Sequence, residues 1–176
     1  GRLGLVANNG SITLSTTSDL SSDSGDIRLY AANNISLGGV VSTAASVMMV
    51  AQAGWIRDAD TDSAVDVVAD GLQLFAGLGA GELGSSENPI ETTITTLSAR
   101  VGAEGIHIRE SDDLIVGNVD VRMDEVDLSG TVIERIYPTQ SDVISSNNGS
   151  IVLRTTNGDI TLNDGTAADN DGAVDA

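Results

Sequence analysis

A short phrase recurs along this chain: turn residues such as Asn, Gly or Asp precede a few residues in which apolar and polar side chains alternate. Apolar residues two apart lie on one face of a β-strand. The phrase therefore predicts many short strands, each with one apolar face, separated by tight turns. It occurs at residues 11–14, 26–29, 34–37, 72–74, 105–108, 119–121, 150–153 and 159–162.

Helices are poorly supported. Gly, Asn, Ser and Thr interrupt almost every window, and apolar residues do not follow the i, i+3, i+4 spacing of an amphipathic helix. The segment 40–53, rich in Ala, Val and Met, is the one candidate. Even there Val47 and Val50, with the flanking Ser and Thr, favour a strand. We expect an all-β fold.

The spacing of the strands is compatible with several all-β folds, and other features of the pattern choose between them. Predicted strand centres lie roughly 8 to 15 residues apart, which also suits a sandwich or a barrel. A parallel β-solenoid is favoured because the strands are very short, the corners lack the paired pattern of a meander, and one phrase returns repeatedly. At about 20 residues per coil the chain makes about eight coils. Residues 76–89 and 123–142 break this rhythm, and we expect them to form protruding loops.

A longer repeat is superimposed on the short one. The phrase Asn8-Asn9-Gly10-Ser11-Ile12-Thr13-Leu14 returns at residues 147–153 with six of seven positions identical, an offset of 139 residues. A second match follows in order, between residues 25–29 and 158–162. We interpret residues 1–176 as one solenoid segment, with about 1–140 forming one tandem unit and 141–176 beginning the next. The chain is expected to be a piece of a longer array.

Charge and composition exclude several functions. The formal net charge is −18, all eight basic residues are Arg, and there is no Cys. Such a surface repels nucleic acid and anionic lipid, because both need basic residues for binding. Disulfides, thiolate zinc sites and cysteine nucleophiles are excluded. No apolar run reaches the roughly 20 residues of a membrane span, so no membrane insertion is expected.

The phrases NNGSI-x-L and SGDI-x-L resemble those of filamentous-haemagglutinin-type adhesins and other giant tandem-repeat surface proteins of bacteria. Residues 87–92, 96–100 and 105–112 are similar to a block that recurs in such exoproteins. The resemblance implies a right-handed parallel β-helix at the bacterial cell surface, with an adhesive or structural role and no enzymatic activity. It also implies neighbouring copies of the repeat as partners, stacked end to end, together with cell-surface glycans or proteins.

An acidic run provides the candidate metal ligands. Asp58, Asp60 and Asp62 form a D-x-D-x-D pattern, with Asp66 four residues later. Carboxylates at this spacing begin a calcium loop. The glycine and the bidentate glutamate of an EF-hand loop are missing here, and the alternative is an acidic loop without an ion. No cofactor is required by the predicted function, and calcium is the one ion that the pattern suggests.

The rival hypothesis is a carbohydrate-active β-helix enzyme, a lyase or hydrolase of acidic polysaccharide. Its candidate residues are Arg109, Asp112 and Asp113, since paired carboxylates can cleave a glycoside. The net charge opposes an anionic substrate, and we expect Asp112 and Asp113 to lie in a solvated corner turn. The single histidine, His107, alternates with Ile106 and Ile108 and is therefore predicted to be an ordinary surface residue.

Overall fold

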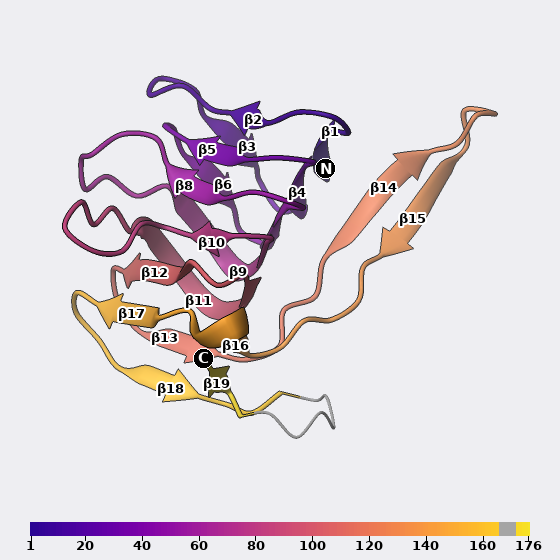
Figure 1. The fold of residues 1–176 in the computed structure, drawn as a ribbon. Helices are drawn as coiled ribbons and strands as arrows, with labels where there is room; N and C mark the ends of the chain where they lie inside the picture. The colour runs from indigo at the N-terminus through magenta and orange to yellow at the C-terminus, as the bar shows by residue number, and fades with distance from the viewer. Residues whose placement is uncertain (166–171) are drawn as a thin grey trace.

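The structure is a computed structural model that describes residues 1–165 and 172–176. The all-β prediction is confirmed: apart from one turn of 3-10 helix at Ser146–Asn148, the regular elements of the described residues are strands. Seventeen strands form one mostly parallel sheet that winds around itself like a β-solenoid. The coils follow one another from the N-terminal to the C-terminal end of the stack (Figure 1). None of the described helical segments is long and apolar enough to cross a membrane.

The strands stack in three columns, in which each strand pairs with its equivalent one coil further on. The first column contains β1 (Leu3–Ala7), β4 (Ile27–Ala31), β7 (Ser46–Ala51), β9 (Val67–Ala76), β11 (Ile90–Val101), β16 (Val143–Ser145) and β19 (Val174–Asp175). The second contains β2 (Ile12–Thr13), β5 (Ile35–Leu37), β8 (Ile56–Asp58), β10 (Gly79–Ala80), β12 (Gly105–Glu110) and β17 (Ile151–Thr155). The third contains β3 (Leu20–Ser22), β6 (Val41–Thr43) and the first residues of β9 and β11. In the last coils β13 (Leu114–Val116) pairs with Thr96 and Leu97 further along β11, and β18 (Ile160–Leu162) pairs with β13.

The core is a set of apolar stacks that run along the axis. In the first column Ile27, Val47, Leu72 and Leu97 pair in register and are all fully buried. This regular stacking explains how a chain with so few aromatic residues buries a continuous core, because each coil adds aliphatic side chains, such as Ile27, Leu29 and Ala31 of β4, that pack on those of the next coil. The coils are unequal in length: 20 residues separate Ile27 from Val47, and 25 separate Val47 from Leu72.

Two excursions leave the stack, close to where they were predicted. The first is narrower than expected: β9 and β10 occupy part of residues 76–89, and the loop is closed by an antiparallel bridge between Glu82 and Asn88. The second contains a hairpin of β14 (Arg122–Val126) and β15 (Val132–Ile136), closed by a bridge between Val119 and Gln140. The residues between Val119 and Gln140 form this excursion and add no coil to the stack. The first column therefore has seven described strands rather than about eight.

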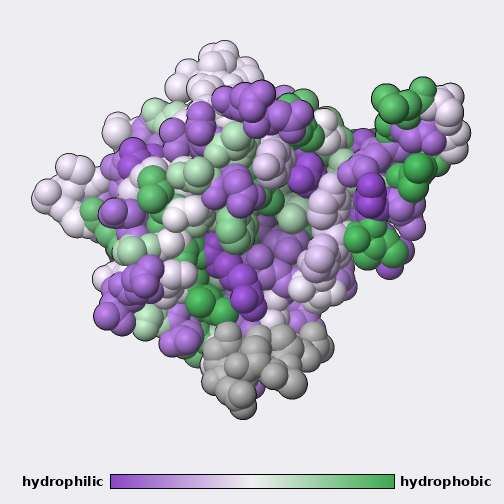
Figure 2. Space-filling model, turned by 45° about the vertical axis from the view of Figure 1, so that its right-hand side comes forward, coloured by the Kyte–Doolittle hydropathy of each residue, from purple (hydrophilic) through white to green (hydrophobic). Residues whose placement is uncertain are grey.

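The hairpin projects from the side of the stack (Figure 1) and is anchored at its base. Met123 belongs to a small separate apolar cluster at this base. Arg2, beside the first strand, pairs with Asp124 and Glu134 at 2.6 Å each. Figure 2 shows apolar side chains gathered towards the end of the hairpin, and these are exposed residues: Val126, Leu128, Val132, Ile133 and Ile136. The arm therefore presents an apolar surface to solvent.

Two local predictions had different outcomes. The segment 40–53 is strand, as β6 and β7, and not helix. Residues 119–121 were predicted to form a strand, and this was wrong: only Val119 makes a β-bridge, because the chain here leaves the stack to begin the hairpin.

Candidate functional site

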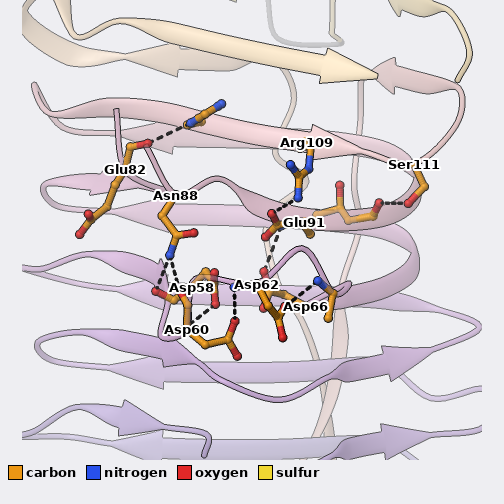
Figure 3. A network of polar contacts seen from close by, with 12 residues as sticks. Asp58, Asp60, Asp62, Asp66, Glu82, Asn88, Glu91, Arg109 and Ser111 are labelled. Atoms are coloured by element: carbon orange, nitrogen blue, oxygen red, sulfur yellow. Dashed lines mark hydrogen bonds and ion pairs between the residues drawn. The ribbon is translucent and has the colours of Figure 1, made fainter. Parts of the chain in front are cut away.

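Three acidic side chains meet at one corner of the solenoid, and we name Asp58, Asp66 and Glu91 the acidic corner (Figure 3). Asp58 is the last residue of β8, Asp66 directly precedes β9, and Glu91 is the second residue of β11 in the next coil. Asp58 is in register with Leu37 of the preceding coil, so a carboxylate occupies a position that is otherwise apolar. The corner thus joins two successive coils.

The geometry of the acidic corner is compact. Each of the three residues offers a carboxylate oxygen, and these oxygens all lie within 4.8 Å of one another. The residues are only 7%, 6% and 4% exposed, respectively. The Glu91 backbone N–H donates to Asp66 Oδ2 at 3.0 Å, and the Asp66 N–H donates to the Glu91 carbonyl at 2.9 Å. Backbone pairing between coils therefore forces the carboxylates together.

Burial makes ionisation of these carboxylates unfavourable. It raises the pKa of the Asp66 carboxyl from its usual 3.8 to about 8, and the charges of Asp58 and Glu91 act in the same direction. Burial also raises the pKa of Glu91, although the Arg109 guanidinium opposes this. Asp58 has a raised pKa for the same reason, opposed by the backbone N–H of Asp60. The corner therefore favours protons or cations.

Arg109 brings a positive charge to the edge of the acidic corner. Its Nη2 lies 2.5 Å from Glu91 Oε1. Glu91, Arg109 and Arg154 are in register in three successive coils. A groove of about 580 Å³, lined by these three residues together with Ser63 and others, opens beside the corner. Water and ions can therefore reach the edge of the site at Glu91.

The acidic run predicted from the sequence is divided by the fold. Asp58 lies in the acidic corner, whereas Asp60 and Asp62 lie in the loop that follows it. Along this run, the Oδ1 atom of each aspartate accepts a hydrogen bond from the backbone N–H two residues further on. Asp58 accepts from Asp60 at 3.0 Å, Asp60 accepts from Asp62 at 3.2 Å, and Asp62 accepts from Ala64 at 2.6 Å. The D-x-D-x-D spacing thus produces consecutive turns. A calcium role for Asp60 and Asp62 stays a prediction.

Glu91 was not found as a candidate from the sequence. It comes from a different coil, and its only local signal is an acidic residue at the start of a Thr-rich strand. Asn88, in the loop before it, reaches back across the corner and donates from Nδ2 to the Asp60 carbonyl at 2.6 Å. The loop of residues 82–88 therefore covers the site from one side.

The surface prediction for His107 was wrong, because the residue is only 2% exposed. Its side chain does alternate with Ile106 and Ile108, but the 82–88 loop folds over it. His107 Nδ1 lies 2.9 Å from the carbonyl oxygen of Glu82 and forms a hydrogen bond with it. Asp112 and Asp113, the carboxylates of the enzyme hypothesis, are exposed in a turn as expected, and Asp113 Oδ1 accepts the N–H of Asp159 at 2.8 Å.

A second groove, of about 470 Å³, lies where the hairpin returns to the stack. Its described lining includes Arg28, Tyr30, Phe75 and Arg100, and no carboxylate. The Arg28 guanidinium lies 5.1 Å from the centre of the Tyr30 ring and 4.7 Å from that of Tyr137. In a protein of net charge −18 this is an uncommon combination of arginine and aromatic surface.

No family model, curated protein or solved structure matches this chain. The resemblance to filamentous-haemagglutinin-type adhesins therefore rests on the sequence phrases alone.

Proposed function

We propose that this chain is a structural, adhesive repeat module of a large secreted bacterial surface protein, wound as a right-handed parallel β-helix and stacked end to end with neighbouring copies. The parallel columns support the architecture. The direction of winding follows the strong preference of parallel connections for the right-handed form. Under this proposal the chain acts outside the cell as part of a rod and carries out no reaction.

The observation that carries the proposal is the exposed core at both ends of the stack. In the N-terminal coil Leu5 is 40% exposed, although its inward-facing partner Leu29 is fully buried. In the C-terminal coil Leu162 is 55% exposed, although its partner Val116 is fully buried. Val174 is likewise 37% exposed. These positions lack only a covering coil, which an adjacent unit would supply.

The repeated phrase supports the same proposal. Ile12 of the first copy and Ile151 of the second lie in the same column, linked in register through Ile35, Ile56, Ala80 and Ile106. Five steps of about 4.8 Å give a repeat of about 24 Å along the axis. The second match is two residues out of line, since Ile27 stacks in line with Leu162 rather than Ile160.

The projecting elements supply the adhesive part of the proposal. The hairpin presents exposed apolar side chains, and the groove at its base combines Arg28 and Arg100 with the rings of Tyr30 and Phe75. Aromatic and arginine side chains are enriched where proteins bind partners. Cell-surface glycans or proteins are the partners proposed for these surfaces.

End-to-end stacking predicts self-association of the chain at high protein concentration. Head-to-tail contacts between copies do not close, so the weight-average mass should rise continuously with concentration. Sedimentation equilibrium at high ionic strength, which screens the −18 charge, measures this. The double variant Leu5→Asp/Leu162→Asp, which puts charges on both exposed ends, should remain monomeric.

The matched control is Val126→Asp/Leu128→Asp, which adds the same charge at the hairpin. It should associate like the unmodified chain. Loss of association in this control alone would move the contact to the hairpin, and a wild-type chain that stays monomeric would contradict end-to-end stacking. Circular dichroism of each variant establishes that it is folded.

A further inference from the structure

One buried oxygen in the acidic corner has no partner. Asp58 is more than nine-tenths buried, and its Oδ1 accepts the Asp60 N–H. Its Oδ2 has no hydrogen-bond partner among the described atoms. An unsatisfied buried carboxylate oxygen is costly, and native proteins rarely keep one without an ion, a water or a proton beside it.

The charges around this oxygen are also unbalanced. Asp58, Asp66 and Glu91 contribute three carboxylates, and the one ion pair recorded for them within residues 1–165 and 172–176 is that of Glu91 with Arg109. Arg57, the residue before Asp58 in β8, pairs with Glu82 at 3.0 Å. Buried charges are usually paired or coordinate a metal. The corner is therefore short of positive charge at the point where the Asp58 oxygen is unpartnered.

We propose that Asp58, Asp66 and Glu91 bind a divalent cation, and that the cation is Ca²⁺. Carboxylate oxygens are the hard ligands that Ca²⁺ prefers, at about 2.3–2.6 Å. Oxygens that all lie within 4.8 Å of one another fit inside one such coordination sphere. The groove beside Glu91 would supply water for the remaining positions.

Calcium at this corner would fasten one coil to the next. Asp58 and Asp66 flank the 59–65 loop, and Glu91 belongs to the following coil. A shared ion would hold the loop closed and resist separation of the coils, so the site would stiffen this part of the solenoid. This inference depends on the acidic corner alone and is independent of end-to-end stacking.

Calcium titration of the cation-free chain tests the site. Isothermal titration calorimetry with CaCl₂ should give one saturable ion per chain. Free Ca²⁺ a hundredfold above the Kd should raise the Tm by about 5–10 °C. MgCl₂ should give a smaller response, because Mg²⁺ demands a more regular octahedron at shorter distances.

Two variants with the same charge change locate the ion. Asp66→Asn/Glu91→Gln should lose both the binding isotherm and the rise in Tm. Asp60→Asn/Asp62→Asn, in the adjacent loop, should keep both. The opposite result would place the ion in the D-x-D-x-D loop and overturn the proposal.

Three further outcomes would also overturn it: no saturable ion in the wild-type chain, an equal response to Mg²⁺, or a linear response typical of general screening. The single variant Asp66→Asn, in which the amide oxygen can still accept the Glu91 N–H, separates loss of binding from loss of folding.

Discussion

Replacing Glu110 with alanine is expected to lower the free energy of unfolding by about 2–6 kcal/mol, because at least two buried donors lose their acceptor at about 1–3 kcal/mol each. Glu110 ends β12 and is fully buried. Its Oε2 accepts the Thr92 hydroxyl at 2.6 Å and the Ile94 N–H at 3.1 Å. Its Oε1 accepts the Ser111 N–H at 2.8 Å.

The position of these donors explains why a carboxylate is needed. β11 pairs with β12 up to Thr92 and with β13 from Thr96 onwards. Between these two stretches, the chain of the next coil turns from β12 into β13 and does not pair with β11. The side chain of Glu110 replaces the missing backbone acceptor for the Ile94 N–H. The loss is therefore one of backbone hydrogen bonding inside the core and not of a surface charge.

Urea denaturation of Glu110→Ala measures the effect, and Glu104→Ala is the matched control. Glu104 is exposed, and its replacement should change stability by less than about 0.5 kcal/mol. Glu110→Gln should fall between the two, because an amide keeps only one accepting atom. A change below about 1 kcal/mol in Glu110→Ala would contradict the proposed role of the carboxylate.

The strands could be predicted because their signal is local. The alternation of apolar and polar residues over three or four positions predicts most of the stacked strands, and β-branched residues distinguish β7 from a helix. The hairpin was recognisable only as a break in the rhythm. Its antiparallel pairing depends on Val126 and Val132 meeting across a turn, which the solenoid pattern does not encode.

The acidic corner could not be predicted, because it depends on register between coils of unequal length. Asp58 faces inward only because it stacks on Leu37, and Glu91 meets Asp66 only through pairing with the next coil. His107 shows the same limit. Its alternation with the neighbouring isoleucines places it on the outer face of the strand, but the 82–88 loop of the previous coil covers that face and buries the side chain.

In the cation-free protein, stability is expected to fall as pH rises between about 4.5 and 8, and Asp66 is the main reason. The unfolded chain releases the Asp66 proton near its usual pKa of 3.8, whereas burial raises the pKa of the folded form to about 8. Between these values the folded state holds more protons, so its stability is greatest at the acidic end. The loss amounts to at most about 1.4 kcal/mol per pH unit for one group.

The difference in the free energy of unfolding between the wild-type chain and Asp66→Asn, followed across this pH range, isolates the contribution of Asp66. Asparagine cannot ionise, so the variant should be the more stable of the two near pH 8 and should lose its advantage towards pH 4.5. Urea midpoints measured in EDTA across this range give the comparison, and Asp62→Asn is the exposed control. Below about pH 4.5 the hydrogen-bonded carboxylates of Glu125 and Asp127, whose pKa values are lowered, begin to lose their own contribution and obscure the result.

The same pair of proteins links protons to calcium at the acidic corner. A bound cation displaces the proton, so saturating Ca²⁺ should flatten the pH dependence of the wild-type chain and reverse the order of stability near pH 8. If the pH difference is found and calcium has no effect, the buried carboxylates share protons instead of an ion. If wild type and Asp66→Asn show the same pH dependence in EDTA, Asp66 is ionised in the folded chain and another group must balance its charge.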